Sequence, residues 1–235
     1  MTHSFVKQTL RSLADPDIAE HSQRFFKTGK GEYGEGDQFL GIRVPELRRI
    51  ARSNSMMPIP ETAKLLQSEF HEERLTALFI LAYRFSRANS AVRKEIYQCY
   101  LQHLDRVNNW DLVDSSAPKI MGPYLEKRDR SVLFKLAKSE NIWHRRVAVM
   151  SCHHFIGNGD VDDALEISRL LLYDDHDLIQ KAVGWTLREI GKRDMTAEEA
   201  FLQKHDYRTF PRVLLRYAIE KFPEPKRKSY LDGNA

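Results

Sequence analysis

One short pattern recurs along the chain and restricts the folds open to it. Each copy opens with a basic residue and continues with an apolar run: RLTALFI from Arg74, RVAVMSC from Arg146, KAVGWTL from Lys181 and RVLLRYA from Arg212. The copies begin 72, 35 and 31 residues apart, and because the first interval is about twice the others, a further copy is expected near residue 110. A period of about 36 residues with two helices in each is typical of an α-solenoid, in which each helix pair buries its apolar face against its neighbours.

The spacing of the apolar residues also predicts an all-α protein. They recur at intervals of three and four, without a convincing period-two stretch between turn residues. We therefore expect a single domain over residues 1–235, a HEAT-like α-solenoid of stacked antiparallel helix pairs with a concave basic groove. The predicted helices are 4–14, 16–27, 45–54, 60–69, 72–86, 90–105, 110–121, 130–138, 141–156, 161–173, 176–192, 196–204 and 210–222.

Composition limits the environment of the protein. With 235 residues, 42% of them hydrophobic, the chain can bury a sizeable core, and a net charge of +4 permits a nucleic-acid partner without requiring one. Cys99 and Cys152 lie in apolar helical patterns, so we expect buried reduced thiols. No apolar run reaches membrane-spanning length and the first residues lack a signal-peptide core, so we expect a cytoplasmic protein without a membrane partner. We also expect a monomer.

Two segments imitate ligand-binding motifs. TGKGEYGEGD (28–37) contains G-x-G-x-x-G, but no strand precedes it and its acidic residues would repel a pyrophosphate, so a flexible loop is expected. The segment 158–169 begins like a calcium loop, yet Asp163 replaces the required Gly and Arg169 the bidentate Glu. His153 and His154 are adjacent and lack helical metal-pair spacing. We therefore expect no cofactor and no metal, and we expect residues 223–235 to form a frayed basic tail.

If the equivalent helices of successive repeats are in phase, five side chains project into one groove: Trp110, Asp114, Arg146, Lys181 and Trp185. Such a groove is basic, with one carboxylate and two indoles at its centre. A carboxylate there would repel phosphates and weaken DNA binding, unless it serves chemistry or is neutralised by Arg146. Asp114 is therefore a candidate functional residue.

Four stretches carry a family resemblance: FLGIRVPELRRIA (39–51), NWDLVDSSAP (109–118), SENIWHRRVAV (139–149) and LIQKAVGWTLREIGK (178–192). They resemble the AlkD-type DNA alkylation-repair glycosylases, bacterial proteins of HEAT-like fold. The resemblance spans most of the chain and agrees with the solenoid predicted from the repeat. It implies an enzyme that releases cationic N3- and N7-alkylated purines from double-stranded DNA.

The resemblance also implies roles for particular residues. The catalytic Asp of the family falls on Asp114, its partner Trp residues on Trp110 and Trp185, and its groove Arg on Arg146. A fixed carboxylate beside C1′ would stabilise oxocarbenium character on the deoxyribose and align the attacking water, and indole faces favour a developing cation. The further candidate DNA-binding residues are Lys181, Arg43, Arg74, Arg212, Lys27 and Lys30.

Structural roles compete with several of these assignments. Asp114 and Arg146 form a plain salt bridge in one alternative, and Trp110 and Trp185 are core residues in another. Arg74 and Arg212 are equally explained as solvated faces of the solenoid. Asp111 is expected to complement the helix dipole, and Trp143 to lie in the core.

The chain departs from the family pattern at three places. Asn109 stands where the family often has a second Trp, Arg43 where the best-known members have Gln, and Phe25 or Phe26 where a Tyr is familiar. These differences affect lesion preference and rate more than fold. Two alternatives to a glycosylase therefore stay open, a non-catalytic member that binds unusual DNA structure and a HEAT-like protein-interaction scaffold.

Overall fold

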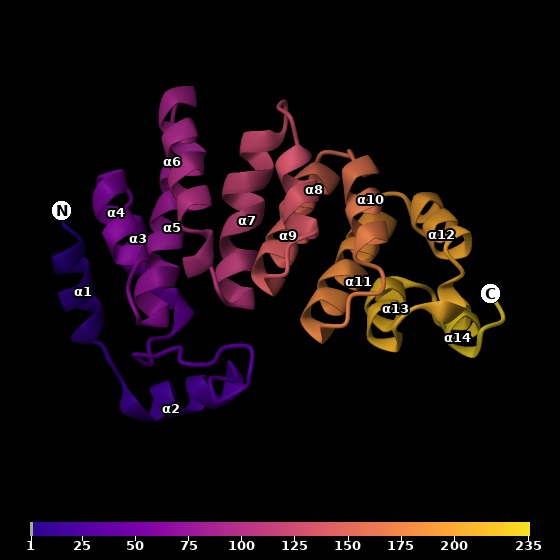
Figure 1. The fold of residues 1–235 in the computed structure, drawn as a ribbon, viewed down its shortest axis with the longest axis horizontal. Helices are drawn as coiled ribbons and strands as arrows, with labels where there is room; N and C mark the ends of the chain where they lie inside the picture. Colours follow the sequence, from indigo (N-terminus) through magenta and orange to yellow (C-terminus); the bar gives the residue numbers. More distant parts are fainter. Residues whose placement is uncertain (1) are drawn as a thin grey trace. The chain divides into compact units, whose positions relative to one another are not determined.

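The computed structural model describes residues 2–235 and divides them into two compact units, here called unit 1, which ends at Tyr124, and unit 2, which begins at Leu125 (Figure 1). Every element named in the described part of the chain is a helix, and the nearest approach to a strand is one isolated bridge between Gln38 and Phe70. The prediction of an all-α protein is confirmed.

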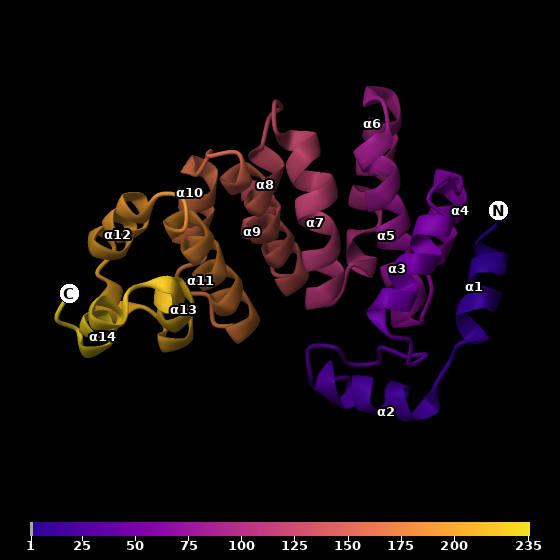
Figure 2. The same ribbon diagram turned by 180° about the vertical axis from the view of Figure 1, so that it is seen from behind.

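Unit 1 is built around one buried helix. Helix α5 contacts α1, α3, α4 and α6, and its apolar residues point in all directions around the axis, as expected for a helix that is enclosed on every side. In Figures 1 and 2, α2 lies with its axis across those of α3 and α5. The helices of unit 1 are α1 (His3–Arg11), α2 (Pro16–Phe25), α3 (Val44–Ser53), α4 (Ile59–Leu66), α5 (His71–Arg87), α6 (Ser90–Gln102), η1 (Leu104–Arg106) and α7 (Trp110–Leu125).

Unit 2 is organised around α9 and α11. Helix α11 contacts α9, α10, α12 and α13. A Cβ added at Gly184 would lie 2.4 Å from the carbonyl oxygen of Leu214, so the close approach of α11 to α13 requires glycine in KAVGWTL. The helices of unit 2 are α8 (Ser131–Ala137), α9 (Ile142–Gly157), α10 (Asp162–Leu170), α11 (Asp177–Gly191), α12 (Met195–Lys204), η2 (Tyr207–Thr209), α13 (Arg212–Ala218), η3 (Ile219–Lys221) and α14 (Glu224–Asp232).

The predicted helices correspond in order to α1–α13, with one correction at the C-terminus. The segment expected to be a frayed tail contains α14, because Tyr230 is only 3% exposed and packs edge-on against Tyr207 and Phe222. Trp143 lies in the core, and Cys99 and Cys152 are buried free thiols, as predicted. Among the described residues, no helix combines the length and the apolarity that crossing a bilayer requires.

Candidate active site

The candidate catalytic residues of unit 1 lie in the first turns of α7. The helix starts at Trp110, and the amide of Val113 donates to the carbonyl of Asn109 over 3.1 Å. Asp114 follows Trp110 by one helical turn, so the two side chains share a face of the helix. Both are partly exposed. The carboxylate of Asp114 is close enough to Tyr100 to add to the effect of burial in raising the pKa of that phenol.

Trp110 belongs to an aromatic cluster at the C-terminal end of α2. Phe26 stacks on the indole with ring centroids 5.2 Å apart and an interplanar angle of 21°. Phe39 in turn stacks on Phe26, with ring centroids 5.1 Å apart. Phe25 meets Trp110 edge-on at 5.9 Å and is 58% exposed. The cluster therefore fixes one side of Trp110 and leaves an exposed aromatic ring beside it.

A chain of alternating charges lies next to this cluster. His71 places its Nδ1 2.8 Å from Asp37 and its Nε2 2.9 Å from Asp111, the residue after Trp110. Arg74 donates to the second oxygen of Asp37 over 2.7 Å. His71, Arg74 and Asp37 are all less than 10% exposed. Asp111, expected to serve the helix dipole, is therefore also the partner of a buried histidine.

The surroundings of His71 and Asp37 favour the charged form of each side chain. Burial acts against a charge on His71, but the charge of Asp111 and hydrogen bonds to Asp111 and Asp37 outweigh it and raise the pKa of the imidazole to about 9. Burial also acts against ionisation of Asp37, but hydrogen bonding and charge from His71 and Arg74 hold its pKa below the ordinary value. His71 is therefore an imidazolium at neutral pH.

His71 is the first of four consecutive buried ionisable residues, HEER at 71–74, here called the HEER turn. The carboxylate of Glu72 accepts the backbone N–H groups of Leu40, Gly41 and Ile42 over 2.8, 2.8 and 3.2 Å. Glu73 accepts from Arg11 of α1 over 2.9 Å. The HEER turn thus connects α1, the segment before α3 and the start of α7 to the central helix of unit 1.

Two glycines allow the segment between α2 and α3 to pack this closely. Gly41 has φ +82°, and an added Cβ would lie 2.0 Å from the carbonyl oxygen of Asp15. Gly34 packs against the start of α7, since an added Cβ would lie 2.5 Å from the carbonyl oxygen of Phe26 and 3.4 Å from Nδ2 of Asn109. Asn109 is fully buried. The glycine-rich loop therefore covers Asn109 at the start of α7.

The candidate residues of unit 2 lie on α9 and α11. Arg146 is 5% exposed and donates to the carbonyl of Leu178 over 2.7 Å. Lys181 is partly exposed and pairs with Asp177 at 2.7 Å, one turn away. The indole N–H of Trp185 donates to Glu189 over 3.1 Å. Arg146 and Lys181 thus have partners within unit 2, and their contacts to DNA stay predictions.

A partly buried histidine supports Trp185. The ring of His153 meets the indole edge-on at 4.9 Å, and its Nε2 lies 3.0 Å from the hydroxyl of Thr186. Burial lowers the pKa of His153 to about 4, helped by the positive charge of Arg146 and opposed by Glu189. His153 is therefore a neutral neighbour of Trp185, as expected for a packing residue.

Arg74 is a correction to the predicted set of DNA-binding residues. Its side chain is only 1% exposed and donates to Asp37 and to the carbonyls of Ser68 and Glu69 over 2.7, 3.1 and 3.0 Å. A phosphate contact would break these buried hydrogen bonds, so the prediction was wrong for Arg74. The basic residue that opens this copy of the repeat belongs to the buried HEER turn.

Comparison with known proteins decides the family. The model of the DNA alkylation repair enzyme family matches residues 6–222, most of the chain. The chain belongs to the DNA alkylation repair enzyme family. No curated protein matches it.

Solved structures with the same fold are distant in sequence. A predicted DNA alkylation repair enzyme from Enterococcus faecalis gives a TM-score of 0.68 at 18% identity, covering 90% of this chain and 97% of that one. AlkD2 from Streptococcus mutans gives 0.56 at 17% identity, covering 92% and 98%. The protein smu.31 of Streptococcus mutans UA159 gives 0.53 at 16% identity, covering 94% and 98%. These matches support the HEAT-like fold predicted from the repeat.

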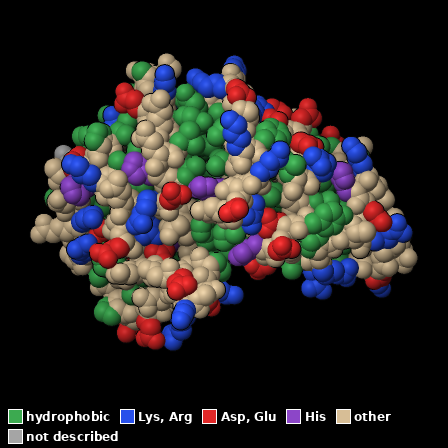
Figure 3. Space-filling view, in the orientation of Figure 1, with side chains coloured by type: hydrophobic (Ala, Val, Ile, Leu, Met, Phe, Trp, Pro, Cys, Tyr) green, Lys and Arg blue, Asp and Glu red, His purple; other side chains and the backbone are tan. Residues whose placement is uncertain are grey.

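Four other basic residues of the predicted DNA-binding set are exposed. Arg43 precedes α3 and Arg212 begins α13, where its guanidinium donates to the carbonyl of Leu231 over 2.8 Å. Lys27 and Lys30 lie in the loop after α2. Acidic side chains are interspersed with Lys and Arg over the face that Figure 3 shows. Exposure leaves a DNA contact open to these four side chains but does not single them out.

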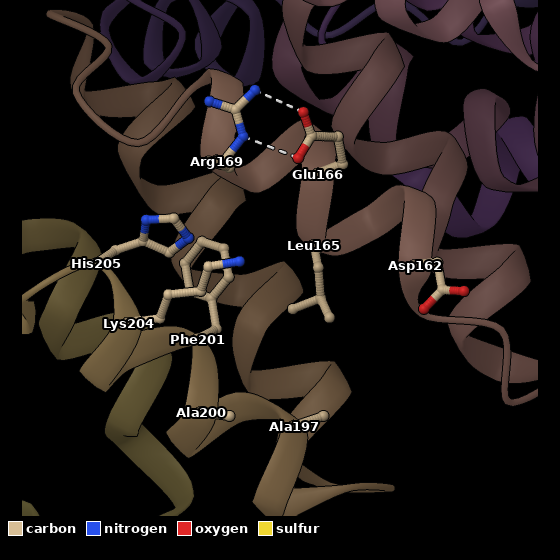
Figure 4. A pocket seen from close by; sticks show the side chains of 9 residues that line it. All are labelled: Asp162, Leu165, Glu166, Arg169, Ala197, Ala200, Phe201, Lys204 and His205. Carbon is tan, nitrogen blue, oxygen red and sulfur yellow. Dashed lines mark hydrogen bonds and ion pairs between the residues drawn. The ribbon is translucent and has the colours of Figure 1, made fainter.

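One cavity of the described part of the chain lies apart from the predicted site. Among residues 2–235, no group of three His, Cys, Asp or Glu side chains could hold a metal ion. A cavity of about 310 Å³ opens between α10 and α12, with Leu165 and Phe201 on its walls and the paired side chains of Glu166 and Arg169 beside it (Figure 4). None of its lining residues belongs to the predicted site.

Sequence reasoning missed the HEER turn because a run of charged residues usually marks a solvated helix face. One signal was present in the sequence. HEER leads without a break into LTALFILA, so a helix over this stretch is apolar all round and its first turn has no free face to offer to water. Four consecutive side chains point in all directions around a helix, so at least some of these charges had to be buried and paired.

Proposed function

We propose that this family member is a DNA glycosylase that hydrolyses the N-glycosidic bond of cationic N3- and N7-alkylated purines in double-stranded DNA. Asp114 carries the proposal. It shares a face of α7 with Trp110, and a carboxylate and an indole one turn apart can address one deoxyribose, the first by its charge and the second by its ring face. Since an alkylated purine already bears a positive charge, the leaving group needs no strong acid.

Fixed negative charge is the main requirement of this chemistry. As the bond to the purine breaks, positive charge develops on the sugar, and a preorganised carboxylate stabilises it without reorganising. The same carboxylate can orient or deprotonate the attacking water. Packing against Phe26 supports a fixed orientation of Trp110. A residue held in this way loses little freedom when the lesion binds.

Unit 2 supplies the other proposed contacts. Trp185 provides a second indole, Lys181 a partly exposed charge, and Arg146 a buried guanidinium. The proposal requires both units to contact the same bound duplex. The exposed cations Arg43, Lys27, Lys30 and Arg212 are proposed to contact phosphates, which fixes the duplex without reading its sequence.

The test is replacement of Asp114 by Asn, which keeps the size of the side chain and removes its charge. We expect single-turnover release of N7-methylguanine and N3-methyladenine to fall by roughly 10²-fold or more, the usual cost of removing one preorganised electrostatic element. Affinity for undamaged duplex should hold or rise, because an anion leaves a phosphate-binding surface. The freed base is measured by mass, so the assay reports bond cleavage and not binding.

Glu95→Gln is the matched control, because Glu95 is an exposed carboxylate of α6 in the same unit. It should leave both excision and affinity unchanged. If Asp114→Asn instead melts earlier and loses excision only in proportion to bound enzyme, Asp114 is a structural partner. A wild type that binds duplex but releases no base would favour a non-catalytic DNA-binding protein, a reading to which the buried Asn109 in place of a Trp lends weight.

A further inference from the structure

We propose that His71 is a positioning residue of the excision reaction: by bridging Asp37 and Asp111, it holds the first turn of α7, and with it Trp110, in the orientation that meets the lesion nucleotide. This inference rests on the proposed glycosylase function. His71 lies beneath the aromatic cluster and is not proposed to touch DNA.

The first observation is the geometry of the bridge. Both ring nitrogens are within 2.9 Å of a carboxylate oxygen, on Asp37 in the segment before α3 and on Asp111 in α7. His71 is only 1% exposed, so its ring nitrogens are shielded from water, while Asp111 keeps part of its carboxylate exposed. Charge-assisted hydrogen bonds of this length are strong and directional. The start of α7 is therefore tied through one ring to the first turn of α5.

The second observation is that the same ring belongs to the stack that supports Trp110. His71 stacks on Phe39 with centroids 4.5 Å apart and lies 5.0 Å from Phe26. Phe26 in turn stacks on Trp110. Trp110 is thus held twice, through the backbone by the bond from His71 to Asp111, and through its indole face by the rings that pack against His71.

The third observation concerns the rest of the charge chain. Arg74 binds the second oxygen of Asp37, so Asp37 keeps a cationic partner when its hydrogen bond to His71 is lost. In the described part of the chain, the ion pair with His71 is the one found for Asp111. The bond from Nε2 to Asp111 is therefore the connection whose loss would release the start of α7.

This asymmetry provides a matched pair of variants. The amide nitrogen of Gln replaces Nε2 in position, so His71→Gln keeps a donor toward Asp111, whereas the shorter His71→Asn keeps a donor toward Asp37 only. Both remove the ring and the charge. We expect His71→Asn to slow single-turnover release of N7-methylguanine about 10- to 100-fold, since misplacement of a positioning element by about 1 Å costs on the order of 10²-fold. His71→Gln should recover most of that rate.

Affinity for undamaged duplex should stay near the wild-type value in both variants, because neither changes a proposed phosphate contact. Rates are compared well below the melting temperature of each variant. If the two variants lose the rate equally, or if His71→Asn keeps the wild-type rate, the positioning role is overturned. A merely structural histidine would lower stability in both variants without separating their rates.

A fluorescence measurement separates failure of this inference from failure of the proposed function. In a Trp143→Phe, Trp185→Phe background, Trp110 is the one remaining indole. His71→Asn should shift its emission to longer wavelength and increase quenching by acrylamide, and His71→Gln should change both less. If the wild type releases no base, the glycosylase proposal fails, and unchanged emission in His71→Asn overturns the positioning of Trp110 whatever the activity.

Discussion

The charge on His71 makes stability depend on pH in a direction that can be calculated. The pKa of the imidazole is raised in the folded protein from 6.5 to about 9. A raised pKa means that the folded state binds this proton more tightly than the unfolded state. The resulting stabilisation is fully present below pH 6.5 and is lost as the pH rises through 9. A difference of about 2.5 pKa units at about 1.36 kcal/mol each gives roughly 3 kcal/mol.

The measurement is urea unfolding followed by circular dichroism at intervals between pH 6 and pH 10, for the wild type and for His71→Gln. The carboxylates of Asp37 and Asp111 contact His71, and the guanidinium of Arg74 binds Asp37. We expect the free-energy difference between wild type and variant to fall by roughly 3 kcal/mol from pH 6 to pH 10.

Taking the difference between the two proteins removes other pH effects. Glu198, for example, also makes the wild type less stable as the pH rises, but it is present in both proteins. A difference that stays constant from pH 6 to pH 10 would refute the conclusion that His71 is a charged bridge. A difference that grows with pH would mean that folding lowers the pKa of His71, so that the folded state favours the neutral ring.

Two further predictions concern unit 2. Lys181→Ala should weaken duplex affinity with little dependence on sequence, because one phosphate contact is lost. The plot of log affinity against log salt should become less steep by roughly one unit. An unchanged slope in a salt titration would exclude that contact. Glu198 is 1% exposed, and burial, followed by the charge of Glu199, raises its pKa to about 9. Because of this raised pKa, the unfolding free energy of the wild type should fall as the pH rises from 4.5 to 9. In Glu198→Gln that fall should be less steep, by up to about 1.4 kcal/mol per pH unit. Urea midpoints that depend on pH equally in the two proteins would contradict this.

The helices were predictable because each long segment keeps one period of apolar residues, and no competing strand pattern exists. The C-terminal helix was missed since PEPKRKSYLDGNA offers one apolar face of only a few residues, and its order depends on Tyr230 packing against Tyr207 and Phe222, which lie elsewhere in the sequence. Local patterns do not report such contacts.

The candidate site was likewise predictable only in part from the sequence. The positions of Trp110 and Asp114 on one helix face follow from their spacing, and the structure agrees. The partners of Asp111 and the burial of Arg74 depend on how the segment before α3 returns to α5, which no local period encodes. That return requires glycine at position 41, since the φ of +82° at Gly41 and its contact with Asp15 leave no room for a side chain.

The HEER turn also has a consequence for the order in which unit 1 forms. Its hydrogen bonds join residues that are distant in sequence, 62 positions apart for Arg11 and Glu73 and 40 for His71 and Asp111. Helix turns close within microseconds, whereas contacts of this separation require long loops to be closed first. Ion pairs gain strength only once water has left, so we expect these contacts to form late, after the apolar part of α5 has collapsed. Contacts that form after the folding transition state slow unfolding and leave the folding rate nearly unchanged.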